Sequence, residues 1–260
     1  MTQNSTELLL LERQAEIRRR LAVSERVIAG DLAQEFRVSD DTIRRDLREL
    51  AAAGQCIRVY GGALPVPAKA PDTPLSVRIG ANLEHKQRLA AAMADFAERG
   101  MTIFLDAGST NLAAAQLLPG NLDLTVATHA PHIAAAIIDR PGIRLFMIGG
   151  KVDEKVGAAT GAQAMRDMER LRPDMAFIGA CAIDAATGVT AFDAEDAEFK
   201  RLLMQQARIK LAASINEKIG TVAPYPVRPV AAFDYIVIEK SLDPHKKAAL
   251  DLAQAVLVSA

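Results

Sequence analysis

The spacing of apolar positions changes once along the chain. Up to about residue 63 apolar residues recur at helical spacing, whereas later ones gather in short runs separated by helical stretches. Six runs are predicted to be strands: Met101–Leu105, Leu122–Ala127, Ile143–Ile148, Met175–Ile178, Ile209–Ala213 and Tyr235–Ile238. Five stretches are predicted to be helices: Ala113–Leu118, Pro131–Asp139, Gln163–Arg170, Glu195–Ala207 and Pro244–Leu252. Apolar strands alternating with helices predict an α/β domain built on a mostly parallel sheet.

A proline-rich segment separates the two regions. It holds Pro65, Pro67, Pro71 and Pro74. Each proline fixes φ and removes a backbone donor, so the segment is predicted to be an extended linker. At roughly 150 residues per domain, 260 residues suit two domains. We expect an N-terminal domain over residues 10–65, a linker over 66–80 and a C-terminal domain over 81–258.

The N-terminal domain has the pattern of two consecutive helices. Ile28, Leu32 and Phe36 recur every four residues, which predicts one apolar face of a first helix. Ser39 is a favourable N-cap for a second helix, and Gly54 lies where a left-handed C-cap would end it. The core face of the second helix is predicted to carry Ile43, Leu47 and Leu50. Residues 27–46 therefore have the layout of a helix-turn-helix.

The opposite face of the second helix is polar. Asp41, Arg44, Arg45 and Arg48 follow one another at helical spacing. Arginine can hold guanine through two hydrogen bonds or pair with phosphate, and Thr42 near the helix start can reach a base edge. The alternative is a three-helix bundle whose arginines are merely solvated.

The segment after the second helix favours DNA binding over that alternative. Residues 57–63 alternate like a short strand and end in Gly61 and Gly62, which permit a tight turn. Such a wing would bring Arg58 and Tyr60 beside the duplex backbone. The complete succession predicts a winged helix-turn-helix.

The same residues resemble a known family. Val38-Ser39, Thr42–Leu47 and Arg58–Ala63 are similar to the signature of DeoR-family bacterial repressors, except that Tyr60 stands where histidine is common. The resemblance implies a homo-oligomer that binds double-stranded operator DNA. The residues expected to contact DNA are Ser39, Thr42, Arg44, Arg45, Arg48, Arg58, Tyr60, Gly61 and Gly62.

In the C-terminal domain, polar residues follow the predicted strands. Residues 106–111, Asp-Ala-Gly-Ser-Thr-Asn, join a strand to a helix, and such a turn can bind an anion through N–H groups and hydroxyls. The alternative is an ordinary capped turn. Thr128-His129, Gly149–Lys151 and Gly179-Ala180 also follow strands. In open α/β sheets, ligands bind beyond the carboxyl ends of the strands.

The DeoR resemblance continues through this half. It implies a sensor domain, similar in fold to ribose-5-phosphate isomerase and CoA transferases, that binds a phosphorylated sugar or related metabolite and needs no cofactor. The residues expected to bind the effector are Asp106, Gly108, Ser109, Thr110, Thr128, His129, Gly150, Lys151, Asp196, Lys200 and Lys218. From the residues alone, charged positions such as Asp196, Lys200 and Lys218 more often belong to the surface than to a binding site.

The chain departs from the family pattern at three places. It has Thr128-His129-Ala130 where the family often has Thr-Asn-Ser, and Asp196-Ala197 where Glu-Ala is usual. Residues 214–218 lack the aspartate of an Asp-x-Ser-Lys motif. These changes alter hydrogen-bonding capacity, so we expect an altered effector pocket behind an intact phosphate loop.

Composition bears on localisation and metal binding but does not add to the DNA-binding prediction. The net charge is −1, and residues 1–63 hold ten Lys/Arg against ten Asp/Glu. Two cysteines without metal-ligand spacing, and neither a membrane span nor a signal peptide, favour the cytoplasm. His129 and His132 have no third ligand at suitable spacing, so no metal site is expected.

Three functional hypotheses follow. The first is a repressor of carbohydrate genes, gated by a phosphorylated metabolite, and not an enzyme. The second is a sugar-phosphate isomerase or CoA-transferase-like enzyme with a DNA-binding head, in which Asp106, Asp196 and Lys200 would be acid/base candidates. In the third, the sensor domain only oligomerises.

Overall fold

The computed structural model describes residues 10–21, 26–52, 56–64 and 75–260. The chain divides into two compact units, Met1–Pro67 and Ala68–Ala260, each with its own core. Each unit has a different architecture, as the change in apolar spacing predicts.

The N-terminal unit is a winged helix-turn-helix. Its helices are α1 (Leu10–Leu21), α2 (Ala29–Phe36) and α3 (Asp40–Ala52), and its strands are β1 (Val27–Ile28), β2 (Ile57–Val59) and β3 (Gly62–Leu64). The strands form an antiparallel sheet in the order β1-β3-β2. Ile43, Leu47 and Leu50 of α3 are buried, as expected, and pack with Leu32 and Phe36 of α2.

One prediction in this unit is wrong. Ile28 does not share a helix face with Leu32 and Phe36, because it lies in β1, opposite Gly62 of β3, and is exposed. Its backbone is extended, and α2 begins one residue later. Val27 is buried in its place. Gly54, the expected C-cap of α3, lies outside the described residues.

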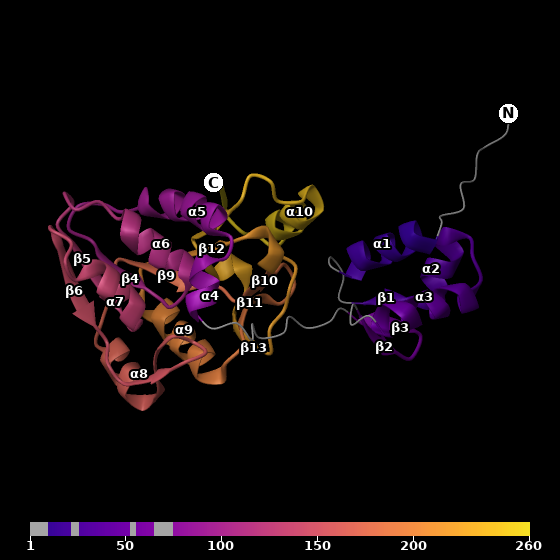
Figure 1. Ribbon diagram of the computed structural model, residues 1–260, viewed down its shortest axis with the longest axis horizontal. Helices are drawn as coiled ribbons and strands as arrows, with labels where there is room; N and C mark the ends of the chain where they lie inside the picture. Colours follow the sequence, from indigo (N-terminus) through magenta and orange to yellow (C-terminus); the bar gives the residue numbers. More distant parts are fainter. Residues whose placement is uncertain (1–9, 22–25, 53–55, 65–74) are drawn as a thin grey trace. The chain divides into compact units, whose positions relative to one another are not determined.

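The C-terminal unit is built on a seven-stranded parallel sheet with helices on both faces (Figure 1). The strand order is β15-β14-β12-β9-β4-β5-β6, and every neighbouring pair is parallel. The strands are β4 (Thr102–Leu105), β5 (Leu124–Thr128), β6 (Ile143–Met147), β9 (Met175–Gly179), β12 (Ile209–Ser214), β14 (Tyr235–Ile238) and β15 (Leu257–Ser259).

Helices cover the sheet in two groups. One face packs against α5 (Leu83–Ala94), α6 (Ser109–Leu117) and α7 (Pro131–Ile137). The other packs against α8 (Gly161–Glu169), α9 (Ala194–Gln206) and α10 (Pro244–Leu252). All six predicted strands and five predicted helices are present, with ends shifted by up to four residues, and α10 and β14 have the predicted bounds.

Several short elements were not predicted. A small antiparallel sheet comprises β10 (Ala182–Asp184), β11 (Gly188–Ala191) and β13 (Tyr225–Arg228), and a hairpin comprises β7 (Lys151–Asp153) and β8 (Ala158–Thr160). Two 3₁₀ turns, Asn216–Lys218 and Val230–Ala232, complete the unit. Most of these strands have three residues, too few for a period-2 pattern to stand out.

The expected linker over residues 66–80 needs a correction at its C-terminal end. Leu75–Gly80 forms a helix, α4, that contacts α6. Arg78 of α4 donates a hydrogen bond to the Lys155 carbonyl (2.8 Å), so this helix belongs to the sensor unit. The segment after Pro74 is free of prolines, which allows it to be helical. Residues 66–74 lie outside the described residues.

Candidate DNA-binding surface and effector site

Ser39 begins the exposed helix of the N-terminal unit. Its Oγ accepts a hydrogen bond from the Thr42 N–H (3.1 Å), as an N-cap residue does. Its hydroxyl also lies 2.8 Å from the Thr42 hydroxyl. Asp40 and Asp41 occupy the first turn, where negative charge is favourable. The start of α3 is therefore fixed by the residues that the sequence singled out.

Arg44, Arg45 and Arg48 are exposed on α3, opposite its buried face. We call these three residues the arginine face. Arg44 pairs with Asp40 (2.6 Å), and Arg45 with Glu49 at a longer 3.4 Å. Exposed pairs of this kind contribute only ~0–1 kcal/mol, so a phosphate or base edge can replace either carboxylate at small cost.

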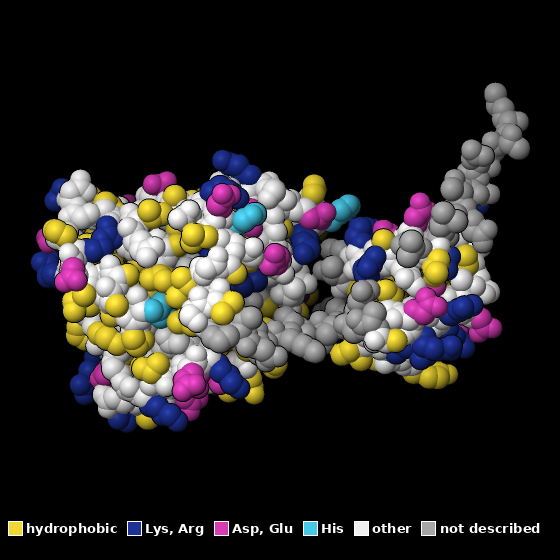
Figure 2. Space-filling view, in the orientation of Figure 1, with side chains coloured by type: hydrophobic (Ala, Val, Ile, Leu, Met, Phe, Trp, Pro, Cys, Tyr) yellow, Lys and Arg dark blue, Asp and Glu magenta, His cyan; other side chains and the backbone are white. Residues whose placement is uncertain are grey.

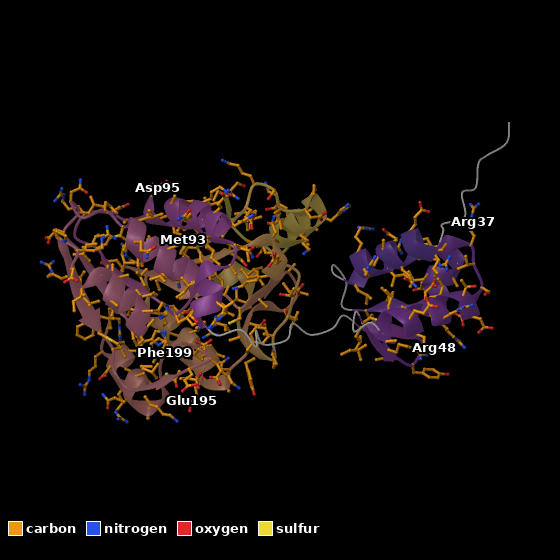
Figure 3. All side chains as sticks on the ribbon, in the orientation of Figure 1. Arg37, Arg48, Met93, Asp95, Glu195 and Phe199 are labelled. Carbon is orange, nitrogen blue, oxygen red and sulfur yellow. The ribbon has the colours of Figure 1, made fainter. Side chains whose placement is uncertain are left out.

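The arginine face and the wing lie on the same side of the unit. Figure 3 labels Arg48 at the lower edge of this unit, where Figure 1 draws β2, and Figure 2 shows Lys and Arg side chains gathered there. The unit as a whole carries no excess of basic residues. The positive charge on this side therefore reflects where the arginines lie in the fold and not an excess of basic over acidic residues in the unit.

The buried side of α3 is held by an ion pair that the sequence did not reveal. Arg13 of α1 bonds Asp46 of α3 through two nitrogens, one of them 3.1 Å from Asp46 Oδ1. Both residues are buried. This bidentate geometry is among the strongest that an ion pair can adopt. The pair fixes α3 against α1.

The wing is a hairpin with a two-residue turn. Val59 of β2 pairs with Gly62 of β3, which leaves Tyr60 and Gly61 at the tip. Gly61 has φ +82°, a backbone angle that residues with a side chain rarely adopt. Arg58 and Tyr60 are exposed, and the Tyr60 ring is fully solvated.

Gly62 has a packing role of its own. A Cβ at this position would lie 1.9 Å from the Val27 carbonyl oxygen, so β3 can approach β1 only without a side chain here. Gly61 and Gly62 shape the wing, whereas Arg58 and Tyr60 provide its exposed chemistry.

In the sensor unit, Asp106 is the centre of a buried polar network. It follows β4 and is fully buried. Its Oδ1 accepts the Ala107 N–H (2.7 Å) and its Oδ2 accepts the Gly179 N–H (2.7 Å). Burial alone would raise the pKa of this carboxyl, but the charge of Lys200, with hydrogen bonds from His129 and Gly179, holds it at about 2. Asp106 is therefore an anion.

His129 follows β5 and is enclosed completely. Its Nδ1 lies 2.8 Å from the Ala159 carbonyl oxygen, and its Nε2 lies 2.9 Å from Asp106 Oδ1. The ring therefore bridges the residue after β4 to the backbone of β8. The ring stacks on Phe199 of α9, the residue that Figure 3 labels on that helix, with centroids 4.0 Å apart.

Lys200 lies between two carboxylates. Its Nζ is 3.2 Å from Asp106 Oδ2 and bonds Asp196, one turn earlier on α9. Burial opposes the charge on Lys200, but the two carboxylates raise its pKa above the ordinary value. Burial raises the pKa of Asp196 while Lys200 opposes it. His129, Asp106, Lys200 and Asp196 thus form one buried polar network in which Lys200 is the shared partner of the two carboxyl groups.

Thr128 belongs to the same interior. Its Oγ1 donates to the Leu105 carbonyl (2.7 Å) and accepts the Ala130 N–H (3.1 Å). Five expected effector residues are buried and bonded to one another or to the backbone: Asp106, Thr128, His129, Asp196 and Lys200. They form the floor beneath the loop after β4.

That loop presents an open helix N-terminus. Gly108 precedes α6 with φ +135°, and no side chain caps the helix among the described residues. Ser109 and Thr110 are half-buried in its first turn. Asn111 fixes the loop from below, because its Nδ2 donates to the carbonyls of Asp106 and Phe177 (both 2.9 Å). Free N–H groups at such a terminus favour an anion.

Four basic residues lie near one another, and one of them, His132, contacts the Gly108 backbone at this terminus: Arg78, Lys86, His132 and Lys218. We call them the cation cluster. None of the four forms an ion pair with a carboxylate in the described part of the chain. Lys86 and Lys218 instead donate to backbone carbonyls, and the Arg78 Nε and His132 Nε2 are buried without a described partner.

The pKa values of Lys86, His132 and Lys218 are lowered by burial and, in addition, by the positive charges near each of them. Burial lowers the pKa of Lys86, and the nearby charges of Lys218 and Arg78 lower it further. Burial lowers the pKa of His132 too, although the backbone of Gly108 and Gly157 opposes the shift. Contact with the Gly108 backbone places His132 beside the loop. Glu217 is the one nearby carboxylate that raises the pKa of Lys86 and Lys218 among the described residues, and it pairs with none of the four, so a bound anion would add compensating charge.

Gly150 and Lys151 lie outside the buried polar network around Asp106. Both are exposed, and Lys151 begins β7, opposite Thr160 of β8. No described contact joins the Lys151 side chain to Asp106 or to the cation cluster. Lys218 does reach the site, since its Nζ donates to the Ala180 carbonyl (3.1 Å).

Sequence reasoning did not name Arg78 or His132 as ligand residues. Arg78 fell within the expected linker, and His132 was considered only as half of a metal pair. Arg78 and Lys86 lie on different helices, α4 and α5, so their spacing in the sequence gives no sign that they lie near one another. Among the described residues no three His, Cys, Asp or Glu side chains form a metal-binding group, and no helix could cross a membrane.

A winged helix-turn-helix joined to an α/β domain defines a DNA-binding transcription regulator. Two family models match: "DeoR-like helix-turn-helix domain" over residues 13–66 and "DeoR C terminal sensor domain" over residues 81–240. The chain belongs to the DeoR family.

Relatives span most of the chain. It is 28% identical to the glycerol-3-phosphate regulon repressor of Escherichia coli (81% of this chain, 83% of the relative). It is 28% identical to the HTH-type transcriptional repressor GlcR of Bacillus subtilis (83% of each) and 29% identical to the HTH-type transcriptional regulator GolR of Listeria innocua (89% and 91%).

Solved structures resemble the chain more distantly. Ribose 5-phosphate isomerase A of Methanocaldococcus jannaschii has a TM-score of 0.40 at 16% identity, over 53% of this chain and 55% of that one. The full-length sorbitol operon regulator SorC of Klebsiella pneumoniae has a TM-score of 0.35 at 11% identity, over 80% and 89%.

Proposed function

We propose that this protein is a transcriptional repressor of carbohydrate genes that binds operator DNA as a homo-oligomer and is released or retained by a phosphorylated sugar. The single observation that carries the effector proposal is the cation cluster near the open N-terminus of α6. Operator DNA as the target puts its action in the cytoplasm. Two of the relatives agree with this role: the glycerol-3-phosphate regulon repressor of Escherichia coli and the transcriptional repressor GlcR of Bacillus subtilis.

The DNA half of the proposal rests on the arginine face. The first turn of α3 enters the major groove, where Thr42 and the arginine face read bases and phosphates. Arg58 and Tyr60 of the wing lie along the adjacent backbone. Ser39 and Gly61 act indirectly, by fixing the ends of the contact surface.

The effector half rests on charge. A phosphate group at Gly108–Thr110 receives hydrogen bonds from N–H groups and hydroxyls and neutralises the repulsion among Arg78, Lys86 and Lys218. His132 offers a further donor from below. The network of Asp106, His129, Lys200 and Asp196 positions the loop and does not contact the phosphate.

The same burial argues against the enzyme hypothesis. A general acid or base must reach the proton that it transfers. Asp106, Asp196 and Lys200 are enclosed and hold one another. We therefore propose that the sensor domain binds a sugar phosphate without converting it.

Gating requires that the effector discriminate between two arrangements of the protein. A ligand shifts an equilibrium only by its difference in affinity for the two states. Arg78 lies on α4, the first described element after the linker. An anion that binds Arg78 therefore acts on the end of the sensor domain to which the DNA-binding domain is tethered.

The effector proposal is tested by thermal unfolding of the full chain with a panel of sugars and their phosphates. A phosphorylated ligand at 100 times its Kd should stabilise the protein by about 2.7 kcal/mol, whereas the matched free sugar should not. Lys86→Met should abolish the response, and the exposed control Lys240→Met should keep it. If no phosphorylated sugar stabilises the wild type, the sensor domain serves oligomerisation only.

The DNA proposal is tested by operator titration. Arg45→Ala should weaken binding by ~1–3 kcal/mol if Arg45 reads a base. Arg172→Ala, a change at an exposed arginine of the sensor unit, should leave affinity unchanged. Equal affinity of the wild type and Arg45→Ala would remove Arg45 from the contact surface.

A further inference from the structure

The parallel sheet of the sensor unit ends in a strand without a partner on its outer side. This strand is β6, Ile143–Met147, which pairs with β5 alone. Phe146 and Met147 are 49% and 44% exposed. Proteins usually protect such an edge with proline, several charges, a bulge or a covering element. Here Arg144 is the single charge, and the edge is apolar.

The apolar character extends beyond the strand. Ile138, directly after α7, and Val152 of β7 are also exposed. Helix α7 packs on β6, and β7 follows it in the chain. Figure 2 shows hydrophobic side chains gathered over the part of the sensor unit where Figure 1 places β6 and α7. A soluble oligomer buries surface of this kind.

The hydrogen-bonding direction of β6 is fixed by its neighbour. The Ile148 N–H donates to the Thr128 carbonyl of β5 (2.9 Å). Both backbone groups of a strand residue point to the same side, and successive residues alternate. Arg144 and Phe146 therefore point their backbone groups toward β5. Ile143, Leu145 and Met147 point theirs outward, where no described residue pairs with them.

We propose that β6 pairs in antiparallel fashion with β6 of a second copy of this chain, which joins the two seven-stranded sheets across a two-fold axis at Leu145. Centring the pair at Leu145 uses all three outward residues, since Leu145 meets its own copy and Ile143 meets Met147. If the two-fold axis lay one residue to either side, fewer of these three residues would have a hydrogen-bonding partner in the other copy. The arrangement is closed, because each copy has one such edge.

The side chains fit the same register. Arg144 of one copy lies directly opposite Phe146 of the other, at a pair without hydrogen bonds, where side chains are closest. A guanidinium beside an aromatic ring is a favourable cation–π contact, and symmetry makes it twice. Ile143 opposite Met147 gives two apolar contacts on the other face. The lone charge of the edge thus becomes part of the interface.

This inference specifies the oligomer of the proposed function but is tested without DNA. Sedimentation velocity of the full chain at micromolar concentration should show dimers or a larger even species. Phe146→Lys places a lysine opposite Arg144 and should raise the dimer Kd at least about tenfold. Leu252→Lys, at a more exposed apolar position on α10 (86% against 49% for Phe146), should leave the mass unchanged.

A crosslink tests the register. With Cys56 and Cys181 replaced by alanine, Leu145→Cys should form a disulfide-linked dimer on mild oxidation, since directly paired residues lie within disulfide reach. Ile143→Cys, opposite Met147 and not its own copy, should not. An unchanged mass for Phe146→Lys, or no crosslink at 145, would overturn the proposal. If the wild-type protein forms the dimer but does not bind operator DNA, the DNA proposal fails and the dimer proposal stands.

Discussion

The imidazole ring of His129 lies parallel to the phenyl ring of Phe199, with centroids 4.0 Å apart and 7° between the planes. Stacked aromatic rings contribute favourable energy beyond the area that they bury. The same ring bonds Asp106 on one edge and the Ala159 carbonyl on the other. His129 thereby joins β4, the residues after β5, β8 and α9.

The first prediction concerns this ring. His129→Ala leaves Asp106 with fewer donors and opens a void beside Phe199. We expect the free energy of unfolding at pH 7 to fall by about 3–5 kcal/mol, as when one partner of a buried pair is removed. Urea unfolding followed by circular dichroism measures it. His245→Ala, an exposed change on α10, should have no effect; equal midpoints for the two variants would show that the ring is dispensable.

The second prediction is a pH dependence at Asp106. Its pKa lies at about 2 in the folded chain, below the ordinary 3.8. A depressed pKa adds stability above about pH 4 that is lost as pH falls toward 2. The stability gap between the wild type and Asp106→Asn should therefore shrink from pH 5 to pH 3.

Denaturant titrations at pH 6, 5, 4 and 3 measure that gap. Asp139→Asn, at an exposed position, provides the control and should follow the wild type at every pH. A gap between wild type and Asp106→Asn that stays constant over this range would mean that Asp106 does not titrate there.

The third prediction separates folding from DNA contact in the N-terminal domain. Asp46→Ala leaves Arg13 buried without its carboxylate, and we expect a loss of about 3–5 kcal/mol in the stability of this domain. Operator affinity should fall with it, because α3 is no longer fixed to α1. Arg45→Ala should weaken DNA binding while leaving unfolding unchanged. Hydrogen exchange at α1 and α3 distinguishes the two effects.

The fourth prediction uses two glycines of the same domain. Gly62→Ala puts a Cβ against the Val27 carbonyl, so β1 and β3 should separate, with a loss of more than about 2 kcal/mol. Gly30→Ala, within α2 and with open space around it, should stabilise the domain by about 0.5–1 kcal/mol. Thermal unfolding compares them, and similar melting temperatures would contradict the close approach at Gly62.

The sequence predicts most of this fold because local rules govern it. The cap at Ser39, the core face of α3 and the six apolar strands each depend on neighbours a few residues away. What it does not predict depends on distant contacts. Ile28 was assigned to a helix because its spacing fits, and only its pairing with Gly62, 34 residues later in the chain, makes it a strand.

The candidate site shows the same division. The loop at Gly108–Thr110 is legible as a strand–turn–helix motif. The roles of Asp106 and His129 are not, because their burial and mutual hydrogen bond arise from residues 23 positions apart. Arg78 was missed since its helix follows a proline-rich segment and only tertiary contacts assign it to the sensor.

The network around Lys200 also constrains how the protein can diverge. Lys200, two carboxyl groups and the His129 ring share one enclosed space, so replacing any single member leaves a buried polar neighbour without its partner. Substitutions here should accumulate in compensating pairs through evolution. A lineage in which asparagine replaces His129 should also have altered Asp196 or another member of the set, and ancestors with one change alone should be rare.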